Sequence, residues 1–166
     1  MDQQAFNTFY HNTHTLLYGY VLRLCGDPAV SDDIVQESYL RFMERPPKQE
    51  QFMAQKSYLY TIATRKLADH FRGNEKMKQT GIAMNNNPAE TDQPVFKEEA
   101  DPAVQEALDL LSHNDKTLLW LAYVEGYGHR EIGQVMNLQP KSIRVLLFRA
   151  RNRLKELLSQ KIKSKT

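Results

Sequence analysis

The sequence has few of the residues that support disulfide or zinc chemistry in small proteins. Its 166 residues include a single cysteine, Cys25, which excludes an internal disulfide and a cysteine-rich zinc site. An excess of one charge sign is also lacking, because 22 Lys and Arg residues stand against 20 Asp and Glu residues, a net charge of +2. Binding to nucleic acid therefore cannot be argued from the total charge, only from how the charges are distributed.

Long hydrophobic runs are missing as well. The longest strongly apolar run, 118–124, is much shorter than the roughly 20 residues that cross a bilayer, so we expect no stable membrane insertion. The first residues show neither a basic stretch nor a following apolar segment, so we expect no secretory signal. Apolar residues make up 41% and charged residues 25%, which excludes wholesale disorder. These features predict a cytoplasmic protein.

Charge is divided unevenly along the chain. Residues 1–72 hold eight basic and eight acidic side chains, whereas residues 73–101 hold three basic and six acidic ones. Residues 102–166 hold eleven basic and six acidic side chains. Within them, residues 141–165 carry nine positive charges against one negative charge. The sequence therefore ends in a strongly basic segment.

Hydrophobic periodicity predicts helices on both sides of a linker. Apolar residues recur at spacings of three and four in several segments: 6–24, 34–42, 55–72, 104–111, 117–124 and from 141 onward. No run alternates with a period of two, so no strand is predicted. Asparagine and proline interrupt the pattern between the two groups of helices. We predict an all-α protein with two small helical domains, 1–72 and 102–166, joined by a flexible acidic linker over 73–101.

A helix-turn-helix is predicted in the second domain. Residues 129–136 form a short helix with Gly133 at a crowded position, 137–140 form a turn, and a long basic helix follows. At 100° per residue the long helix places its apolar residues on one arc. The opposite arc and its flanks collect Lys141, Arg144, Val145, Phe148, Asn152, Lys155, Arg149 and Arg151. This face either contacts DNA or is a solvated charged surface.

The helix at 55–72 has a similar division. Thr61, Arg65, Ala68 and Arg72 form one stripe at spacings of four, three and four, with Tyr58 and Tyr60 near its start. Basic residues beside aromatic rings suit single-stranded nucleic acid, because bases stack on rings while arginine follows phosphates. The bland alternative is that both tyrosines pack at the edge of the core and that Asp69 partly neutralises the arginines.

Motifs for catalysis are missing. The five histidines show no ligand spacing beyond His11 and His14, a pair that is more typical of a solvated helix than of a metal site. No glycine-rich phosphate loop, nucleophile motif or metal-binding motif occurs. We therefore expect no enzyme, no catalytic residues, no cofactor and no metal site.

Three stretches of the chain resemble the extracytoplasmic-function (ECF) sigma factors, the minimal two-domain members of the bacterial sigma family. Residues 32–39 are similar to the acidic helix of region two, and residues 58–72 to the promoter-reading helix of the same region. Residues 131–136, followed by 142–144 and 148–151, are similar to the helix-turn-helix of region four. The stretches occur in the order of the family, so the resemblance covers nearly the whole chain.

The resemblance implies three binding surfaces. Docking on the β′ subunit of core RNA polymerase would use Asp32, Asp33, Gln36 and Glu37. The minus-ten promoter element would meet Tyr58, Tyr60, Thr61, Arg65 and Arg72, and the loop 46–56 would hold a flipped base. The upstream, minus-thirty-five element would meet Lys141, Ser142, Arg144, Val145, Phe148, Arg149 and Arg151.

The family resemblance has local departures. Arg65 stands where the family often has asparagine, and Asn137 replaces a usual glycine in the turn. Val145 and Leu146 occupy positions that are often polar. These departures concern which promoter sequence is read more than the function itself.

The function implied is that of an ECF sigma factor. Such a protein directs core RNA polymerase, through its β′ and β subunits, to promoter DNA and helps to open it, while the polymerase carries out nucleotidyl transfer. An anti-sigma factor is an expected further partner. Two other classes stay open: a stand-alone helix-turn-helix regulator, which would bind its site without polymerase, and an interaction-only adaptor or decoy, which would lack the arginine-lined face.

Overall fold

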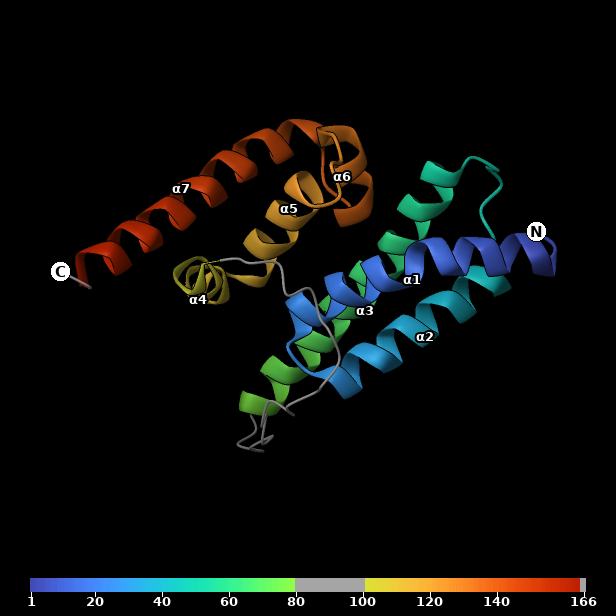
Figure 1. Ribbon diagram of the computed structural model, residues 1–166, viewed down its shortest axis with the longest axis horizontal. Helices are drawn as coiled ribbons and strands as arrows, with labels where there is room; N and C mark the ends of the chain where they lie inside the picture. Colours follow the sequence, from blue (N-terminus) through green and yellow to red (C-terminus); the bar gives the residue numbers. More distant parts are fainter. Residues whose placement is uncertain (80–100, 165–166) are drawn as a thin grey trace. The chain divides into compact units, whose positions relative to one another are not determined.

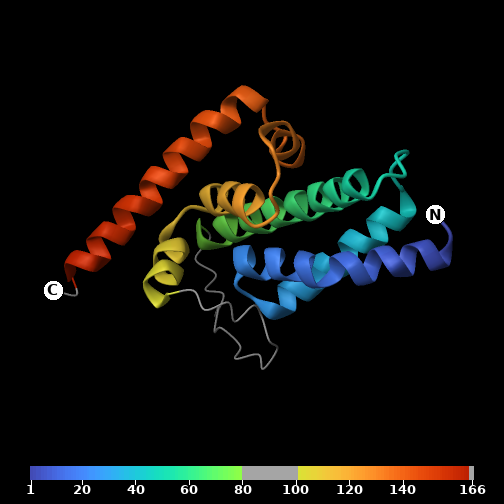
Figure 2. The same ribbon diagram turned by 45° about the horizontal axis from the view of Figure 1, so that its top comes forward.

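The computed structural model describes residues 1–79 and 101–164, and all regular structure in these ranges is α-helical. The helices are α1 (Gln3–Cys25), α2 (Pro28–Glu44), α3 (Phe52–Gln79), α4 (Pro102–Leu110), α5 (His113–Tyr123), α6 (His129–Met136) and α7 (Pro140–Ser164). They form two compact units, α1–α3 and α4–α7 (Figures 1 and 2). The predicted all-α class with two helical domains is confirmed.

The junction between α1 and α2 shows how the sequence sets its helix ends. Gly26 follows α1 with a φ of 77°, the left-handed conformation in which glycine avoids a steric penalty, and its N–H donates to the carbonyl of Leu22 at 2.7 Å. The carboxylate of Asp27 then accepts hydrogen bonds from the N–H groups of Ala29 and Val30, with Pro28 at the first helical position. Three consecutive residues therefore end one helix and begin the next.

The core of the first unit contains two buried tyrosine–threonine pairs. Thr13 donates its hydroxyl proton to the carbonyl of Phe9, so its oxygen accepts the hydrogen bond from the Tyr39 hydroxyl, 2.7 Å away. Thr64 likewise donates to the carbonyl of Tyr60 and accepts from Tyr20 at 2.7 Å. The first pair joins α1 to α2 and the second joins α1 to α3. Each satisfies hydroxyl groups that would otherwise be costly to bury.

The second unit is built around the contact between α6 and α7. Ile132 and Val135 of α6 pack into the same core as Ile143 and Leu147 of α7, and all four side chains are buried. The short connection is closed by Asn137, whose φ of 57° ends α6, and by a hydrogen bond from the N–H of Leu138 to a carbonyl of α6. The predicted helix-turn-helix is present.

Gly133 explains why the turn can be this tight. A Cβ atom at this position would lie 2.6 Å from the backbone oxygen of Leu138, closer than real Cβ contacts allow. The backbone of the turn therefore passes directly over α6, and only glycine fits. The crowding predicted at Gly133 is confirmed.

Two predicted helix boundaries differ from the structure. The helix predicted over 55–72 begins earlier and continues to Gln79, because nothing between Arg72 and Gln79 stops a helix and Gly73 lies in open space. The helix predicted over 117–124 also begins earlier, at His113, since the hydroxyl of Ser112 accepts from the N–H of Asp115 as an N-cap. The predicted linker beyond Gln79 lies outside the described residues.

Candidate nucleic-acid and protein interfaces

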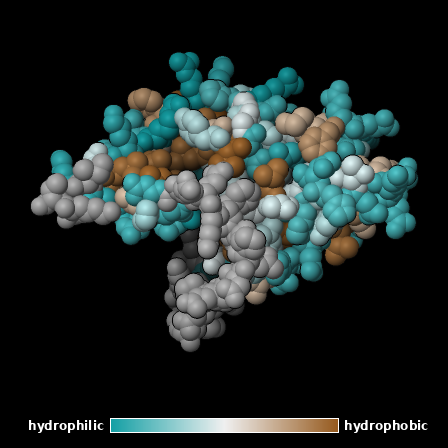
Figure 3. Space-filling view, viewed as in Figure 1, coloured by the Kyte–Doolittle hydropathy of each residue, from teal (hydrophilic) through white to brown (hydrophobic). Residues whose placement is uncertain are grey.

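Helix α7 separates a buried face from an exposed basic face. Ile143 and Ala150 are 0% exposed, whereas Val145 is 48% exposed and Phe148 is 59% exposed. Figure 3 shows hydrophilic side chains along the outer side of α7 and hydrophobic ones on the side toward α5. Two exposed apolar side chains, Val145 and Phe148, among arginines make this face a candidate for contact with a partner.

The candidate residues of the upstream-element surface all lie on the exposed face. Each is exposed in the structure: Lys141, Ser142, Arg144, Val145, Phe148, Arg149 and Arg151. The Arg151 guanidinium donates to the Tyr123 hydroxyl at 2.8 Å, which orients this arginine without neutralising it. The surface therefore combines hydrogen-bond donors, positive charge and an apolar ring on one side of a helix.

Two cations of the basic segment serve a different purpose that sequence reasoning missed. Arg153 donates to both carboxylate oxygens of the buried Asp115, at 2.9 and 2.7 Å, and ties α7 to α5. Lys161 forms an ion pair with Glu106 of α4. Helical periodicity does place Arg153 away from the exposed arc. Its partner lies 38 residues earlier, however, so no local signal could have found the pair.

The candidate minus-ten residues of α3 do not all share one surface. Arg65 and Arg72 are exposed and Thr61 is half-buried, with its hydroxyl bonded to the carbonyl of Ser57. Arg72 pairs with Asp69 at 2.7 Å, the partial neutralisation that the sequence suggested. Tyr58 is half-buried, and its hydroxyl donates to the carbonyl of Arg45 at 2.6 Å.

Tyr60 is a correction to the predicted surface. Its side chain is 0% exposed, and its ring lies 5.0 Å from the ring of Tyr20. The ammonium group of Lys56 sits 5.6 Å from the centre of the Tyr60 ring. Because α1 and Lys56 cover the ring, no base can stack on it. The alternative of packing in the core is the one that the structure supports for Tyr60.

The candidate docking residues lie on the outer face of α2. Asp32, Asp33, Gln36 and Glu37 are all exposed. The intervening apolar residues face inward, since Ile34, Val35 and Tyr39 are 7%, 3% and 5% exposed. Burial raises the pKa of Tyr39 to about 12, so its phenol stays protonated and keeps its hydrogen bond to Thr13.

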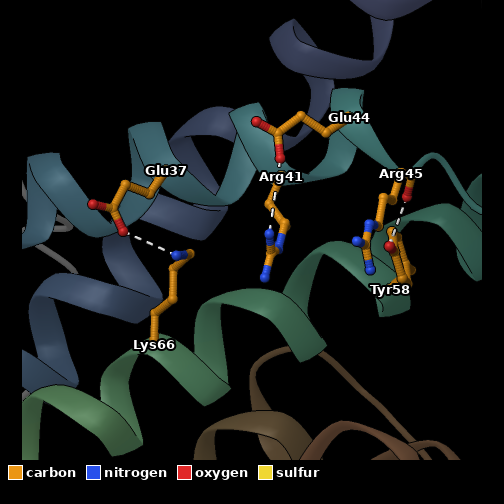
Figure 4. A network of polar contacts seen from close by, with 6 residues as sticks. All are labelled: Glu37, Arg41, Glu44, Arg45, Tyr58 and Lys66. Carbon is orange, nitrogen blue, oxygen red and sulfur yellow. Dashed lines mark hydrogen bonds and ion pairs between the residues drawn. The ribbon is translucent and has the colours of Figure 1, made fainter.

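Glu37 already has an ion-pair partner within the first unit. Its carboxylate lies 2.9 Å from the ammonium group of Lys66 on α3, as Figure 4 shows. The pair bridges the exposed edges of α2 and α3, and Glu37 remains 62% exposed. Asp32, Asp33 and Gln36 are therefore the cleaner candidates for contact with a partner.

An apolar groove borders the same face of α2. It has a volume of about 380 Å³ and lies between α1 and α2, where Tyr10, His14, Gln36, Leu40 and Met43 are among the residues that line it. Leu40 and Met43 are 56% and 52% exposed. Exposed apolar side chains beside polar ones are typical of a protein-binding surface.

A cluster of metal ligands and a membrane-spanning helix are both absent from the described ranges. Within them no three His, Cys, Asp or Glu side chains come together as metal ligands would. None of the helices in residues 1–79 and 101–164 combines the length and the apolar character needed to span a bilayer.

Comparison with known proteins matches both units to one family. Sigma-70 region 2 matches residues 9–77, and Sigma-70 region 4 matches residues 102–154. The RNA polymerase sigma factor SigS of Staphylococcus aureus strain N315 is 28% identical over 146 residues, which is 85% of this chain and 90% of that protein. SigS of strain NCTC 8325 is 29% identical over the same length.

Solved structures share the fold. The sigma factor RpoE from Bartonella quintana, crystallised with the anti-sigma factor NepR, superposes with a TM-score of 0.74 at 21% identity and covers 93% of this chain and 96% of that one. The anti-anti-sigma factor PhyR of the same organism superposes with a TM-score of 0.53 at 16% identity, over 94% of this chain and 50% of its own.

The order of the two matched regions agrees with the order of the two helical units. Region 2 matches residues in α1–α3, and region 4 matches residues in α4–α7 and includes the helix-turn-helix. Sigma factors act in transcription initiation and catalyse no reaction themselves. The chain belongs to the sigma-70 family and is an ECF-type RNA polymerase sigma factor built from region 2 and region 4.

Proposed function

We propose that the two units divide promoter recognition between them. The unit α1–α3 docks on core RNA polymerase and engages the minus-ten element, whereas the unit α4–α7 reads the upstream element. The observation that carries this proposal is the division of α7 into an apolar face, on which Ile143, Leu147 and Ala150 are buried, and an exposed face with arginines around Phe148. A helix of this kind, placed after a tight turn from a shorter helix, suits the major groove.

On α7 the proposal separates base contacts from phosphate contacts. Arg144 and Phe148 lie one turn apart near the start of the helix, where a recognition helix meets base edges. An arginine can donate to the acceptors of guanine, and a phenylalanine can contact the methyl group of thymine. Lys155 lies farther along the exposed face, where the helix passes the DNA backbone.

Replacement of Arg144 and Lys155 tests this division. Arg144→Ala should weaken promoter binding by about 1–3 kcal/mol and relax the preference at one position of the upstream element. Lys155→Ala should weaken binding equally for all upstream sequences and lower the slope of log K against log salt by about one unit. Both are measured with holoenzyme on a set of single-base variants of the upstream element.

The two variants serve as controls for each other. Arg144→Ala that weakens every upstream variant equally would make Arg144 a phosphate contact and contradict the groove geometry. A change of base preference with Lys155→Ala would make Lys155 a base contact and would also contradict the groove geometry.

On the first unit we assign roles only to accessible residues. Asp32, Asp33 and Gln36 contact core polymerase, together with the apolar groove beside them. Thr61, Arg65 and Arg72 of α3 contact the minus-ten element, and the half-buried ring of Tyr58 lies at the start of the same stripe. Exposure, positive charge and spacing along one side of α3 support this assignment.

Regulation by an anti-sigma factor is part of the proposal. The structurally similar RpoE was crystallised with the anti-sigma factor NepR, and the two proteins share a fold over most of their length. We infer that an anti-sigma factor also binds this chain and competes with the polymerase. The complex would form in the cytoplasm, where the polymerase acts.

A decoy role is the alternative that the fold alone leaves open, since the anti-anti-sigma factor PhyR shares it. The exposed arginines and Phe148 of α7 favour DNA binding, because a decoy needs no DNA surface. Dependence of DNA binding on core polymerase distinguishes a stand-alone regulator from a sigma factor. Tight and specific binding to a promoter by the free chain would favour the regulator, and binding only with core enzyme would favour the sigma factor.

A further inference from the structure

Two arginines at the end of α2 lie on the edge that borders α3. Arg41 and Arg45 are four residues apart, one on the last turn of α2 and the other at its C-cap. In Figure 4 the side chains of Arg41 and Arg45 lie along the boundary between α2 and α3. Tyr58 and Lys66 of α3 lie along the same boundary. We call this line, with Arg41, Arg45, Tyr58 and Lys66, the α2–α3 seam.

The positively charged side chains of the α2–α3 seam differ in how closely an acidic side chain pairs with them. Lys66 is compensated by Glu37 at 2.9 Å. The Arg41 guanidinium is 3.8 Å from the carboxylate of Glu44, beyond hydrogen-bond distance, and its side chain is 57% exposed. Arg45 is exposed, and in the part of the chain that the structure describes no ion pair neutralises it. Both guanidinium groups therefore keep donors available for an anion.

Tyr58 adds an aromatic surface to the seam. Its hydroxyl donates to the carbonyl of Arg45 at 2.6 Å, which ties the end of α2 to α3 and holds Arg45 beside the ring. The Tyr58 ring also packs near Phe42, with 5.8 Å between the ring centres. Cations next to a partly accessible ring are the combination that binds single-stranded nucleic acid.

We propose that Arg41 and Arg45 bind phosphates of the unpaired DNA strand, which follows the α2–α3 seam. The strand then runs from the exposed side of α3, at Arg65, onto the end of α2. Guanidinium groups bind phosphate oxygens through paired hydrogen bonds, and the positions of the two arginines do not depend on base sequence. This inference rests on the proposed minus-ten role of α3 and adds a second helix to that surface.

The test uses holoenzyme assembled from the full chain and core RNA polymerase. The probe is a forked promoter DNA with an unpaired non-template strand, on a promoter first obtained by run-off transcription of a genomic library. A single-stranded phosphate contact contributes about 0.7 to the salt slope, so Arg41→Ala with Arg45→Ala should lower the slope by about 1.4. The loss should be the same for different bases in the unpaired strand.

Two matched variants sharpen the test. Arg41→Lys with Arg45→Lys keeps the charges and should keep most of the slope. Glu44→Gln removes the anion beside Arg41 and should tighten binding to the fork, the opposite sign to the alanine pair. Arginines that merely stabilised the end of α2 would change thermal unfolding and leave the slope unchanged, which would overturn the proposal.

A loss of affinity for core polymerase would also overturn it, because the arginines would then belong to a protein contact. This outcome is measured separately, by binding of the labelled chain to core enzyme without DNA. The roles proposed above for α7 and for the acidic face of α2 are tested on duplex upstream elements and by core binding. Neither of those measurements involves the unpaired strand. A failure of the roles proposed for α7 and α2 is therefore distinct from a failure of the strand contact proposed for Arg41 and Arg45.

Discussion

Two residues of the same type can affect the stability of this protein in opposite directions. Gly133 and Gly73 are both helical glycines, and helix propensity alone favours replacing either by alanine. The space around them differs. A Cβ at Gly133 would clash with the backbone oxygen of Leu138 at 2.6 Å, whereas nothing lies within 4 Å of a Cβ at Gly73.

The two glycine replacements should therefore change stability in opposite directions. Gly133→Ala should lower the free energy of unfolding by about 1–3 kcal/mol, because the turn between α6 and α7 must move away. Gly73→Ala should raise it by about 0.5–1 kcal/mol. Urea unfolding followed by circular dichroism measures both, and a stabilising Gly133→Ala would show that the turn is not held as described.

Two arginines of α7 should also differ in how much they contribute to stability. Arg153→Ala leaves the buried carboxylate of Asp115 without its two hydrogen bonds and should cost about 1.5–3 kcal/mol. Arg149 is exposed and has no such partner in the described ranges, so Arg149→Ala should change stability by less than about 0.5 kcal/mol. Thermal unfolding compares the two. Equal effects would mean that the Asp115 contact does not support the unit.

At the scale of elements, α2 has three different sides. Its inner side supplies Ile34, Val35 and Tyr39 to the core, its outer side carries the acidic docking candidates, and its edge toward α3 carries Arg41. A helix this short can serve three contacts because its successive residues are 100° apart. Substitutions on one side are therefore expected to leave the other two intact.

Core docking by the outer side of α2 is tested with Asp33→Asn and Gln36→Ala combined. Both side chains are exposed, so helix content should not change, while affinity for core polymerase should fall about tenfold or more if each contact contributes roughly 1 kcal/mol. Glu37 is left in place because its replacement would also break the pair with Lys66. Glu50→Gln, in an exposed loop, is the control. Unchanged binding in a pull-down would remove these residues from the docking surface.

At the scale of the whole molecule, each unit has a core of its own. Leu17, Tyr20 and Leu59 are fully buried within α1–α3, and Leu121 and Ile132 are fully buried within α4–α7. Residues 1–79 and residues 101–166 should therefore fold as separate fragments. Each fragment should show helical circular dichroism and a cooperative thermal transition. A fragment that stayed unfolded alone would show that its core depends on the rest of the chain.

The helical class, the two units, the turn between α6 and α7, and the basic face of α7 could all be predicted from the amino-acid sequence. These follow from local rules, since caps such as Gly26 and Asp27 and the spacing of apolar residues act within a few positions of the chain. The exposed face of α7 was predictable because the apolar arc that opposes it is in the same helix.

Contacts between side chains of different helices, by contrast, depend on how the helices pack in the folded chain. Tyr60 and Tyr58 look alike in sequence, but α1 covers Tyr60 completely while Tyr58 stays partly accessible. Arg153 and Arg149 look alike until α5 brings Asp115 to one of them. Periodicity orients a residue around its own helix and carries no information about which helix packs there. The partners of these residues, 38 or more positions away in two cases, could therefore be found only in the folded chain.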